Sequence, residues 1–152
     1  MAQTTGALSW SDVHIQLSND NFSANDVDID GWSNSVKVSS GERAVSEFFT
    51  SDGDTPIVTY GKRSALEITV QIVYTEGATE AFEVCRAAYE AATKIYLKWS
   101  PKGGSPTNFS YLTTGGGYLT KPPYPQGAAD SADALSFELV LKCPKITKSV
   151  LA

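Results

Sequence analysis

Histidine is almost missing from this sequence, which has only His14 among its 152 residues. Metal centres and general acid–base sites draw on histidine more than on most other side chains. The sequence also contains no G-x-S-x-G nucleophile motif, no P-loop and no G-x-G-x-x-G dinucleotide motif. We therefore predict that the protein is not an enzyme, and we expect it to hold neither a metal nor a cofactor.

Cysteine and long apolar runs are scarce as well. Cys85 and Cys143 lie far apart and form no C-x-x-C pair, so we interpret both as buried core thiols, with a disulfide as the less favoured alternative. No apolar run approaches the roughly 20 residues that a membrane-spanning helix needs. Residues 1–6 lack the basic and apolar segments of a secretory signal. We expect a protein that is made in a cytoplasm and has no membrane partner.

Positive charge is in the minority, with 12 Lys and Arg against 17 Asp and Glu, and the formal net charge is −5. Proteins that hold nucleic acid by its phosphates need a basic surface, so DNA is expected to be tolerated by this protein rather than bound. The hydrophobic fraction of 41% and the charged fraction of 19% are ordinary for a globular protein. We expect a single domain over residues 1–152 with a flexible N-terminal arm at about 1–10.

Alternation of apolar and polar side chains indicates that most of the chain is β-strand. The most regular runs are 66–74 and 135–142, where one side of each run is apolar and the other polar. Further strands are predicted at 13–17, 36–49, 57–60, 95–99 and 108–113. Ser40-Gly41-Glu42 interrupts one of these runs and predicts a bulge or a tight reversal. The segment 18–35 has a loop composition, with Trp32 as its large apolar anchor.

One segment changes to helical spacing and predicts a single helix over 78–93. Its apolar stripe consists of Phe82, Cys85, Tyr89 and Ala92, and its polar side of Glu80, Glu83, Arg86 and Glu90. A helix flanked by strands must bury such a stripe on a sheet. The predicted fold is therefore mainly β, an antiparallel β-sandwich or curled sheet of seven or eight strands with one packed α-helix.

Two features suggest chemistry but are better explained as structure. The run 26–31 begins like the D-x-D-x-D-G of a calcium loop, but Lys37 stands where that loop needs a bidentate Glu, and no helix flanks it. We interpret this run as an acidic surface loop that turns at Gly31. His14 lies on the polar side of a predicted strand and is interpreted as an exposed structural residue.

Aromatic residues leave a second function open. A carbohydrate-binding β-sandwich module would need an exposed stacking platform, for which the candidates are Tyr96, Trp99, Tyr111, Tyr118 and Tyr124. Aromatic residues on alternating strands more often close a core or an interface. Carbohydrate binding is kept as the alternative.

Several segments, in their order along nearly the whole chain, together resemble one protein family. They are Gly41-Glu42-Arg43, Tyr60-Gly61-Lys62-Arg63, a strand at 65–75 that leads into an Ala-rich helix, Ile95-Tyr96-Leu97-Lys98-Trp99-Ser100-Pro101-Lys102-Gly103, and a Gly-rich stretch before a terminal strand. In this order they resemble the tail tube (major tail) proteins of long-tailed bacteriophages. The sequence does not separate these proteins from the tube proteins of contractile injection or secretion devices, which are an alternative. Another phage structural protein, such as a head–tail connector or tail-end protein, is a weaker alternative.

The resemblance implies a structural subunit of the virion tail that is assembled in the host cytoplasm. Six copies would form a ring whose sheets join edge to edge into a barrel, and the rings would stack into a tube through which DNA passes without specific binding. The implied partners are further copies of the chain and other tail proteins, namely the tape measure, initiator and terminator. Pairing sheet edges between subunits would also remove the liability of open edges. The net charge of −5 predicts an acidic lumen that repels phosphates.

Candidate residues for these two roles come from alternation and from loop composition. The polar sides of three strands would face the lumen if the helix lies outside, and they comprise Lys37, Ser39, Glu67, Thr69, Gln71, Ser136 and Glu138. An ordinary solvent face on a monomer is the alternative interpretation of this set. Ring stacking is predicted to use the N-terminal arm before Trp10 and one polar loop, which consists of Ser51, Asp52, Gly53, Asp54, Thr55 and Pro56.

Overall fold

The computed structural model describes residues 6–24, 26–31, 33–130 and 132–151. Along the chain the elements are η1 (Trp10–Asp12), β1 (His14–Ser18), β2 (Asp26–Asp28), β3 (Ser33–Ser40), β4 (Arg43–Phe48), β5 (Ile57–Arg63), β6 (Leu66–Val73), α1 (Ala81–Ala91), β7 (Tyr96–Ser100), β8 (Phe109–Thr114), β9 (Tyr118–Leu119), β10 (Ser136–Cys143) and β11 (Lys145–Val150). The described part of the chain contains no helix with the length and hydropathy needed to cross a bilayer. The prediction of a mainly β protein with one α-helix is confirmed.

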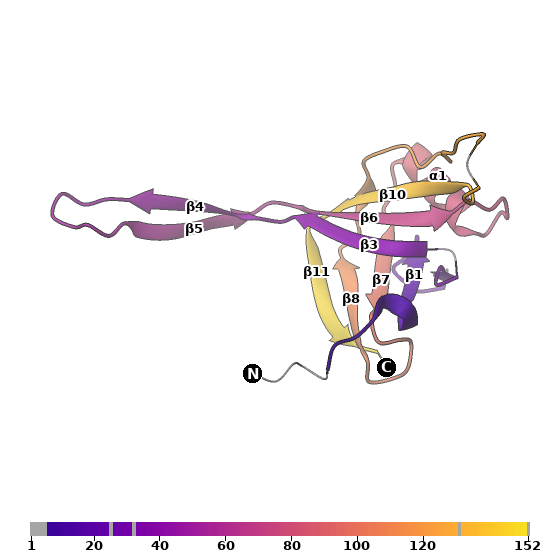
Figure 1. The fold of residues 1–152 in the computed structure, drawn as a ribbon, viewed down its shortest axis with the longest axis horizontal. Coiled ribbons are helices and arrows are strands. Elements are labelled where there is room, and N and C mark those ends of the chain that lie inside the picture. Colours follow the sequence, from indigo (N-terminus) through magenta and orange to yellow (C-terminus); the bar gives the residue numbers. More distant parts are fainter. Residues whose placement is uncertain (1–5, 25, 32, 131, 152) are drawn as a thin grey trace.

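The strands form three antiparallel sheets. Five strands pair in the order β11-β8-β7-β1-β2, four in the order β3-β6-β10-β9, and β4 pairs with β5 alone. In Figure 1, β3, β6 and β10 run along the long axis of the molecule, whereas β7, β8 and β11 run across it. The two larger sheets therefore pack with their strands crossing, as in orthogonal sheet packing, and they do not close into a barrel within the described residues.

The core lies between these two sheets and α1. The five-stranded sheet contributes Ile15, Leu17, Leu97 and Trp99, and the four-stranded sheet Ile68, Val70, Ile72, Phe137, Leu139 and Leu141. Phe82 of α1 makes edge contacts with the rings of Tyr74 and Phe137, at centroid distances of 4.8 and 5.5 Å. Cys85 and Cys143 are free and buried, as predicted, and burial raises the pKa of the Cys85 thiol to about 12.

The helix is shorter than predicted. Glu80 adopts an extended conformation as N-cap and accepts a hydrogen bond from the Gly77 N–H at 3.2 Å, so residues 78–80 form a turn instead of the first helical residues. Ala92 has φ 54°, a left-handed C-cap that ends the helix and removes this residue from the buried stripe. Tyr89 is half-buried, and Ala88 takes the buried position next to Cys85.

Three strands lie where none was predicted. β2 falls inside the predicted loop 18–35, because pairing with β1 orders a short acidic segment that has no clear strand pattern of its own. β9 has only two residues, and β11 follows β10 directly after Pro144 and pairs with β8 along its whole length. The anchor predicted at Trp32 lies outside the described residues. Of the N-terminal arm predicted at about 1–10, residues 1–5 also lie outside them, 6–9 are exposed without regular structure, and Trp10 begins η1.

The interruption at Ser40-Gly41-Glu42 is the point where the chain leaves the body of the molecule. β3 continues into β4, and β5 continues into β6, so residues 41–65 form a two-stranded extension that we call the hairpin arm (Figure 1). Gly41 has φ +81°, and a Cβ there would lie 2.4 Å from the Leu66 side chain. The positive φ favours glycine at this joint, and a Cβ would also force the Leu66 side chain to move.

The joint is held by Ser64. Its backbone N–H donates to the Glu42 carbonyl at 3.0 Å, and its hydroxyl accepts from the Gly41 N–H at 3.1 Å. These bonds bridge the gap between the β3–β6 ladder, which ends at Ser40 and Leu66, and the β4–β5 ladder. Nine residues of extended chain from the joint to Thr50 give the hairpin arm a length of about 30 Å.

We expect the Phe137→Ala variant to lose about 3–5 kcal/mol of unfolding free energy, because the ring is 1% exposed and sits between the sheets and α1. Urea denaturation of dilute protein measures the loss. Phe48→Ala is the matched control, since this ring on the hairpin arm is 66% exposed and its removal should change monomer stability little. Equal losses for the two variants would contradict this description of the core.

Candidate assembly surfaces

All seven residues predicted for the lumen lie on one face of the four-stranded sheet, opposite the face that packs into the core. Directly opposed residues of an antiparallel pair share a face. The register opposes Lys37 with Thr69, Ser39 with Glu67, Gln71 with Glu138, and Ser136 with Val73. The Gln71 amide also donates to the Ser136 hydroxyl at 3.2 Å. The structure thus brings the whole set together as one surface, which we call the polar face.

The polar face is not acidic by itself. Lys142 lies directly opposite Glu67 on it and was not among the predicted candidates, although the alternation in 135–142 already places it there. Together with Lys37 and Glu138, this gives two positive and two negative side chains. The acidic lumen stays a prediction that would require carboxylates from outside this sheet.

One residue of the polar face departs from the pattern. Val140 lies opposite Thr69 but is only 2% exposed. Beside it the chain leaves the β10 edge and returns, since the Thr120 N–H donates to the Val140 carbonyl at 3.1 Å and the Gln126 N–H to the Ser136 carbonyl at 2.9 Å. The segment 120–126 therefore occupies part of this edge of the sheet.

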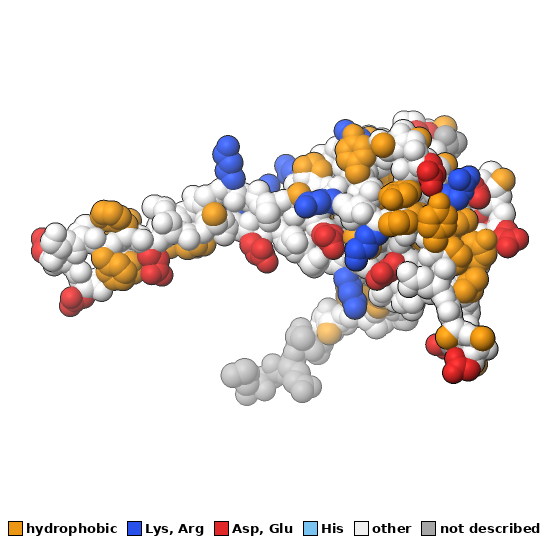
Figure 2. All heavy atoms as spheres, turned by 90° about the horizontal axis from the view of Figure 1, so that it is seen from above, with side chains coloured by type: hydrophobic (Ala, Val, Ile, Leu, Met, Phe, Trp, Pro, Cys, Tyr) orange, Lys and Arg blue, Asp and Glu red, His pale blue; other side chains and the backbone are white. Residues whose placement is uncertain are grey.

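The hairpin arm is exposed over nearly its whole length. Every residue from 42 to 64 is exposed except Pro56, which is partly buried. Large hydrophobic side chains that are at least half exposed lie along it, namely Val45, Phe48, Phe49, Ile57, Val58 and Tyr60. Figure 2 shows such side chains on both sides of the arm, next to acidic groups at its far end. The loop predicted for stacking, Ser51 to Pro56, is the tip of this arm.

A hollow of about 790 Å³ lies at the other end of the four-stranded sheet. Its floor is the start of β3, the end of β6 and the start of β10, and its wall is the loop before β10. The lining residues are Gly31, Ser33, Asn34, Gln71, Ile72, Val73, Gln126, Gly127, Ala128, Ala129, Asp133, Ala134, Leu135 and Ser136. Nothing in the sequence pattern pointed to this hollow, because three distant segments form it.

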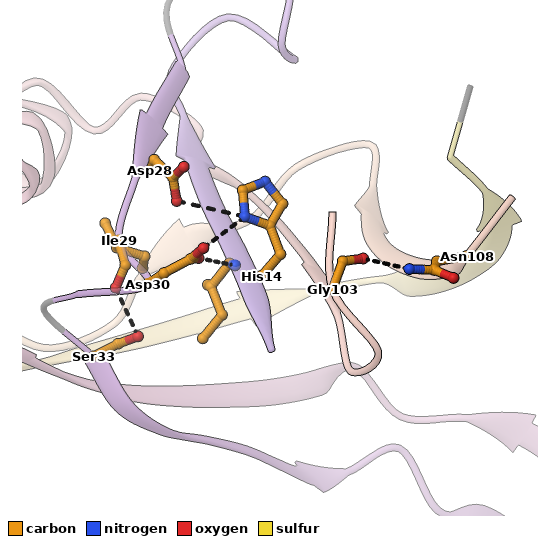
Figure 3. Close-up of polar contacts among 8 residues, drawn as sticks. His14, Asp28, Ile29, Asp30, Ser33, Gly103 and Asn108 are labelled. Carbon is orange, nitrogen blue, oxygen red and sulfur yellow. Dashed lines mark hydrogen bonds and ion pairs between the residues drawn. The ribbon is translucent and has the colours of Figure 1, made fainter. Parts of the chain in front are cut away.

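His14 is not the exposed residue that the sequence suggested. Its side chain is 22% exposed, and its Nδ1 lies 2.7 Å from an Asp30 carboxylate oxygen and 3.6 Å from one of Asp28 (Figure 3). The other Asp30 oxygen accepts a hydrogen bond from the Ile15 N–H. Among the described residues these three form a group that could hold a metal ion, but their mutual contacts already explain it as a clamp between β1 and the residues around β2.

The pKa values of the two carboxylates of this clamp are shifted in opposite directions. Partial burial works to raise the pKa of Asp30, but hydrogen bonds from Ile15, His14 and Asp28 outweigh it and lower the pKa from its ordinary value. The pKa of Asp28 is raised, by partial burial and by its hydrogen bond to and charge repulsion from Asp30. Asp30 is thus the residue that holds its charge in the folded state.

Solved structures of tail and injection-device components have a similar fold. The SPP1 tail tube aligns with a TM-score of 0.68 at 15% identity, over 95% of this chain and 80% of that chain. The tail of the empty GTA particle aligns with a TM-score of 0.67 at 16% sequence identity, over 96% of this chain and 100% of that chain. A chain of the PVC sheath–tube complex, from an extracellular contractile injection system, aligns with a TM-score of 0.64 at 13% sequence identity. This alignment covers 97% of this chain and 95% of that chain. The chain has a tail-tube fold.

This tail-tube fold is shown by structure and not by sequence. No family model matches the sequence, and no curated protein matches it either. The alignments cover at least 95% of this chain in the three structures named above, so they include the hairpin arm as well as both larger sheets. The predicted resemblance to tail tube proteins is confirmed at the level of the fold.

We expect Asp30→Asn to lower the unfolding free energy of this tail-tube fold by about 1–2 kcal/mol at pH 7, because a charged acceptor of two hydrogen bonds is lost. A lowered pKa means that the stabilisation is present above the ordinary carboxyl pKa and disappears as the pH falls through the pKa of folded Asp30. The difference from the wild type should therefore shrink in acid. Urea denaturation between pH 3 and pH 7 measures it.

Asp28→Asn is the matched control for this prediction. The raised pKa of Asp28 means that its charge is not favoured in the folded state, so this variant should lose less stability than Asp30→Asn at pH 7. A larger loss for Asp28→Asn would show that the clamp does not depend on Asp30.

Proposed function

We propose that this chain is a non-enzymatic structural subunit of a tail tube, acting as a single domain that assembles with copies of itself into stacked hexameric rings. The observation that carries the proposal is the exposed hairpin arm on a tail-tube fold. An isolated two-stranded hairpin is marginally stable in water, and exposed apolar side chains of this number mark a surface that is buried in an assembly. Other copies of the same chain are the simplest partners that could bury these side chains.

The ring is supported by the sheet edges and by the similar structures. β3 and β2 are edge strands of their sheets, and β11 is the other edge of the five-stranded sheet. Edges of this kind are satisfied when subunits pair around a closed ring. The GTA tail is described with C6 symmetry and the AFP baseplate as six-fold symmetrised. Six subunits per ring is the symmetry that we propose for this chain.

We assign the polar face to the lumen of the tube. It is the polar side of the sheet whose other side packs against the core and α1, so a ring with α1 outside would turn it inward. Two lysines balanced by two glutamates make a hydrophilic wall without an excess of positive charge. DNA could pass such a wall without being held, since tight phosphate binding needs several unopposed cations.

The wider assembly follows from the same proposal. A tube of this kind would belong to a virion tail built in a host cytoplasm, with tape measure, initiator and terminator proteins as partners. The similar PVC structures, one a sheath–tube complex and one a sheath/tube terminator, and the AFP tube terminating cap support an injection device equally, so a contractile device is the second candidate.

Carbohydrate binding finds no support in the arrangement of the aromatic residues. Trp99 is 7% exposed and stacks on Tyr111 at a centroid distance of 5.8 Å, within the body of the protein. Tyr118 and Tyr124 are exposed, but Tyr124 donates to Glu90 of α1 at 2.9 Å. The five candidates therefore do not form one exposed platform.

We expect Glu67→Lys combined with Glu138→Lys to leave tube assembly intact but to slow DNA passage, because unopposed lysines would repeat at every ring and attract phosphates. The measurement is the rate of DNA ejection from assembled particles. The control is Lys37→Glu with Lys142→Glu, which changes the same face by an equal charge of opposite sign and should eject normally. If both variants ejected DNA at the wild-type rate, the polar face would not line the lumen.

We also expect that replacing Ser51 to Thr55 by a two-residue turn preserves the folded subunit but prevents long tubes, because the tip of the hairpin arm is proposed to reach the next ring. Circular dichroism and thermal melting check the fold, and electron microscopy measures tube length. Tubes of normal length from the shortened arm would refute its role in stacking.

A further inference from the structure

The hairpin arm and the hollow lie at opposite ends of the same strand pair. β3 begins at the floor of the hollow with Ser33 and ends at the joint with Ser40, and β6 runs from Leu66 at the joint to Val73 in the hollow. A projecting element at one end and a recess at the other are the two halves of a head-to-tail contact. When such a contact repeats without a closing rotation, it produces an open-ended stack.

The chemistry of the hollow suits the tip of the hairpin arm. Its volume of about 790 Å³ is in the range of well-formed binding sites. Val73 and Leu135 offer apolar surface, being 37% and 44% exposed, and the amides of Asn34 and Gln126 offer N–H donors. The lining contains no lysine or arginine and one charged side chain, the carboxylate of Asp133, so the hollow is not built for a phosphate.

The tip of the hairpin arm offers apolar side chains and hydrogen-bond acceptors that match the apolar surface and the amide donors of the hollow. Phe48, Phe49 and Ile57 stand at the end of the β4–β5 ladder, each more than half exposed. The turn beyond them carries the carboxylates of Asp52 and Asp54, which are acceptors for amide donors. Burying the three apolar side chains against Val73 and Leu135 would remove from water the surface that makes the isolated hairpin marginal.

We propose that the hollow receives the tip of the hairpin arm from a second copy of this chain, and that this contact sets the stacking of one ring on the next. This inference rests on the proposed function. The proposed tube requires only that the arm reach a neighbouring subunit, and the inference adds which surface of that subunit receives it. A contact within one chain is ruled out by distance, since the arm extends about 30 Å away from the body and the hollow is at the far end of the sheet.

Disulfide trapping tests the proposal. The Asp54→Cys, Ala129→Cys double variant places one thiol on the tip and one at the rim of the hollow, both on exposed positions. The native thiols give little background, because Cys85 and Cys143 are at most 1% exposed. After assembly and mild oxidation, we expect a ladder of covalent oligomers on a non-reducing gel, whereas each single variant can form dimers at most.

The matched control is the Asp54→Cys, Ala87→Cys double variant, whose second thiol is on the exposed side of α1 and should give no ladder. A ladder from the first variant alone supports the proposal. Tubes that assemble normally but give no ladder, or an equal ladder from the control, overturn the receiving role of the hollow and leave the tail-tube function standing. A chain that stays monomeric at high concentration overturns both.

Filling the hollow gives a second readout that does not depend on thiol chemistry. Ala129→Trp should leave the circular dichroism spectrum and melting temperature of the subunit unchanged while strongly shortening the tubes seen by electron microscopy. Ala87→Trp places the same side chain on α1 and should assemble like the wild type. Normal tubes from Ala129→Trp would contradict the proposal.

Discussion

The antiparallel pairing of β3 with β6 is the constraint on which the rest of the structure depends. Its register is fixed because one side of both strands is buried, and a slip of one residue would expose Ile68, Val70 and Ile72 and bury the polar side. The same two strands supply the core side of the four-stranded sheet, the polar face, the floor of the hollow and, through their continuation beyond Gly41, the hairpin arm. One pairing thus helps to position the polar face, the hollow and the hairpin arm.

The subunit divides into a body that is stable by its own burial and an arm that is not. The body encloses a single cluster of buried side chains from two sheets and α1, and the clamp of His14 and Asp30 ties the short acidic strand β2 to it. The hairpin arm has backbone pairing but no burial. This division is what a subunit needs if it is to stay folded while free and gain its remaining stabilisation only when it contacts other copies.

Charge is distributed in a way that total composition does not reveal. The net charge of −5 is a property of the whole chain, whereas the polar face has equal numbers of lysines and glutamates. Acidic residues occur instead at the tip of the hairpin arm and along α1, as with Asp52 and Glu83. A lumen formed by the polar face would pass DNA through its lack of excess cations and not through strong repulsion.

The sequence by itself determined the regular strands, the presence of one helix and the polar side of the sheet, because alternation with period two and spacing of three to four residues are local properties. It did not predict β2, β9 and β11, whose short segments are ordered by pairing with other strands. It also located Gly41 as an interruption and the loop from Ser51 to Pro56 as a turn. Only the tertiary structure decided that this interruption is the base of a long arm, that His14 meets Asp30, and that Gly31, Gln71 and Leu135 border one hollow. These facts depend on which strands pair and how the sheets cross, and residues far apart in sequence leave no local pattern of their meeting.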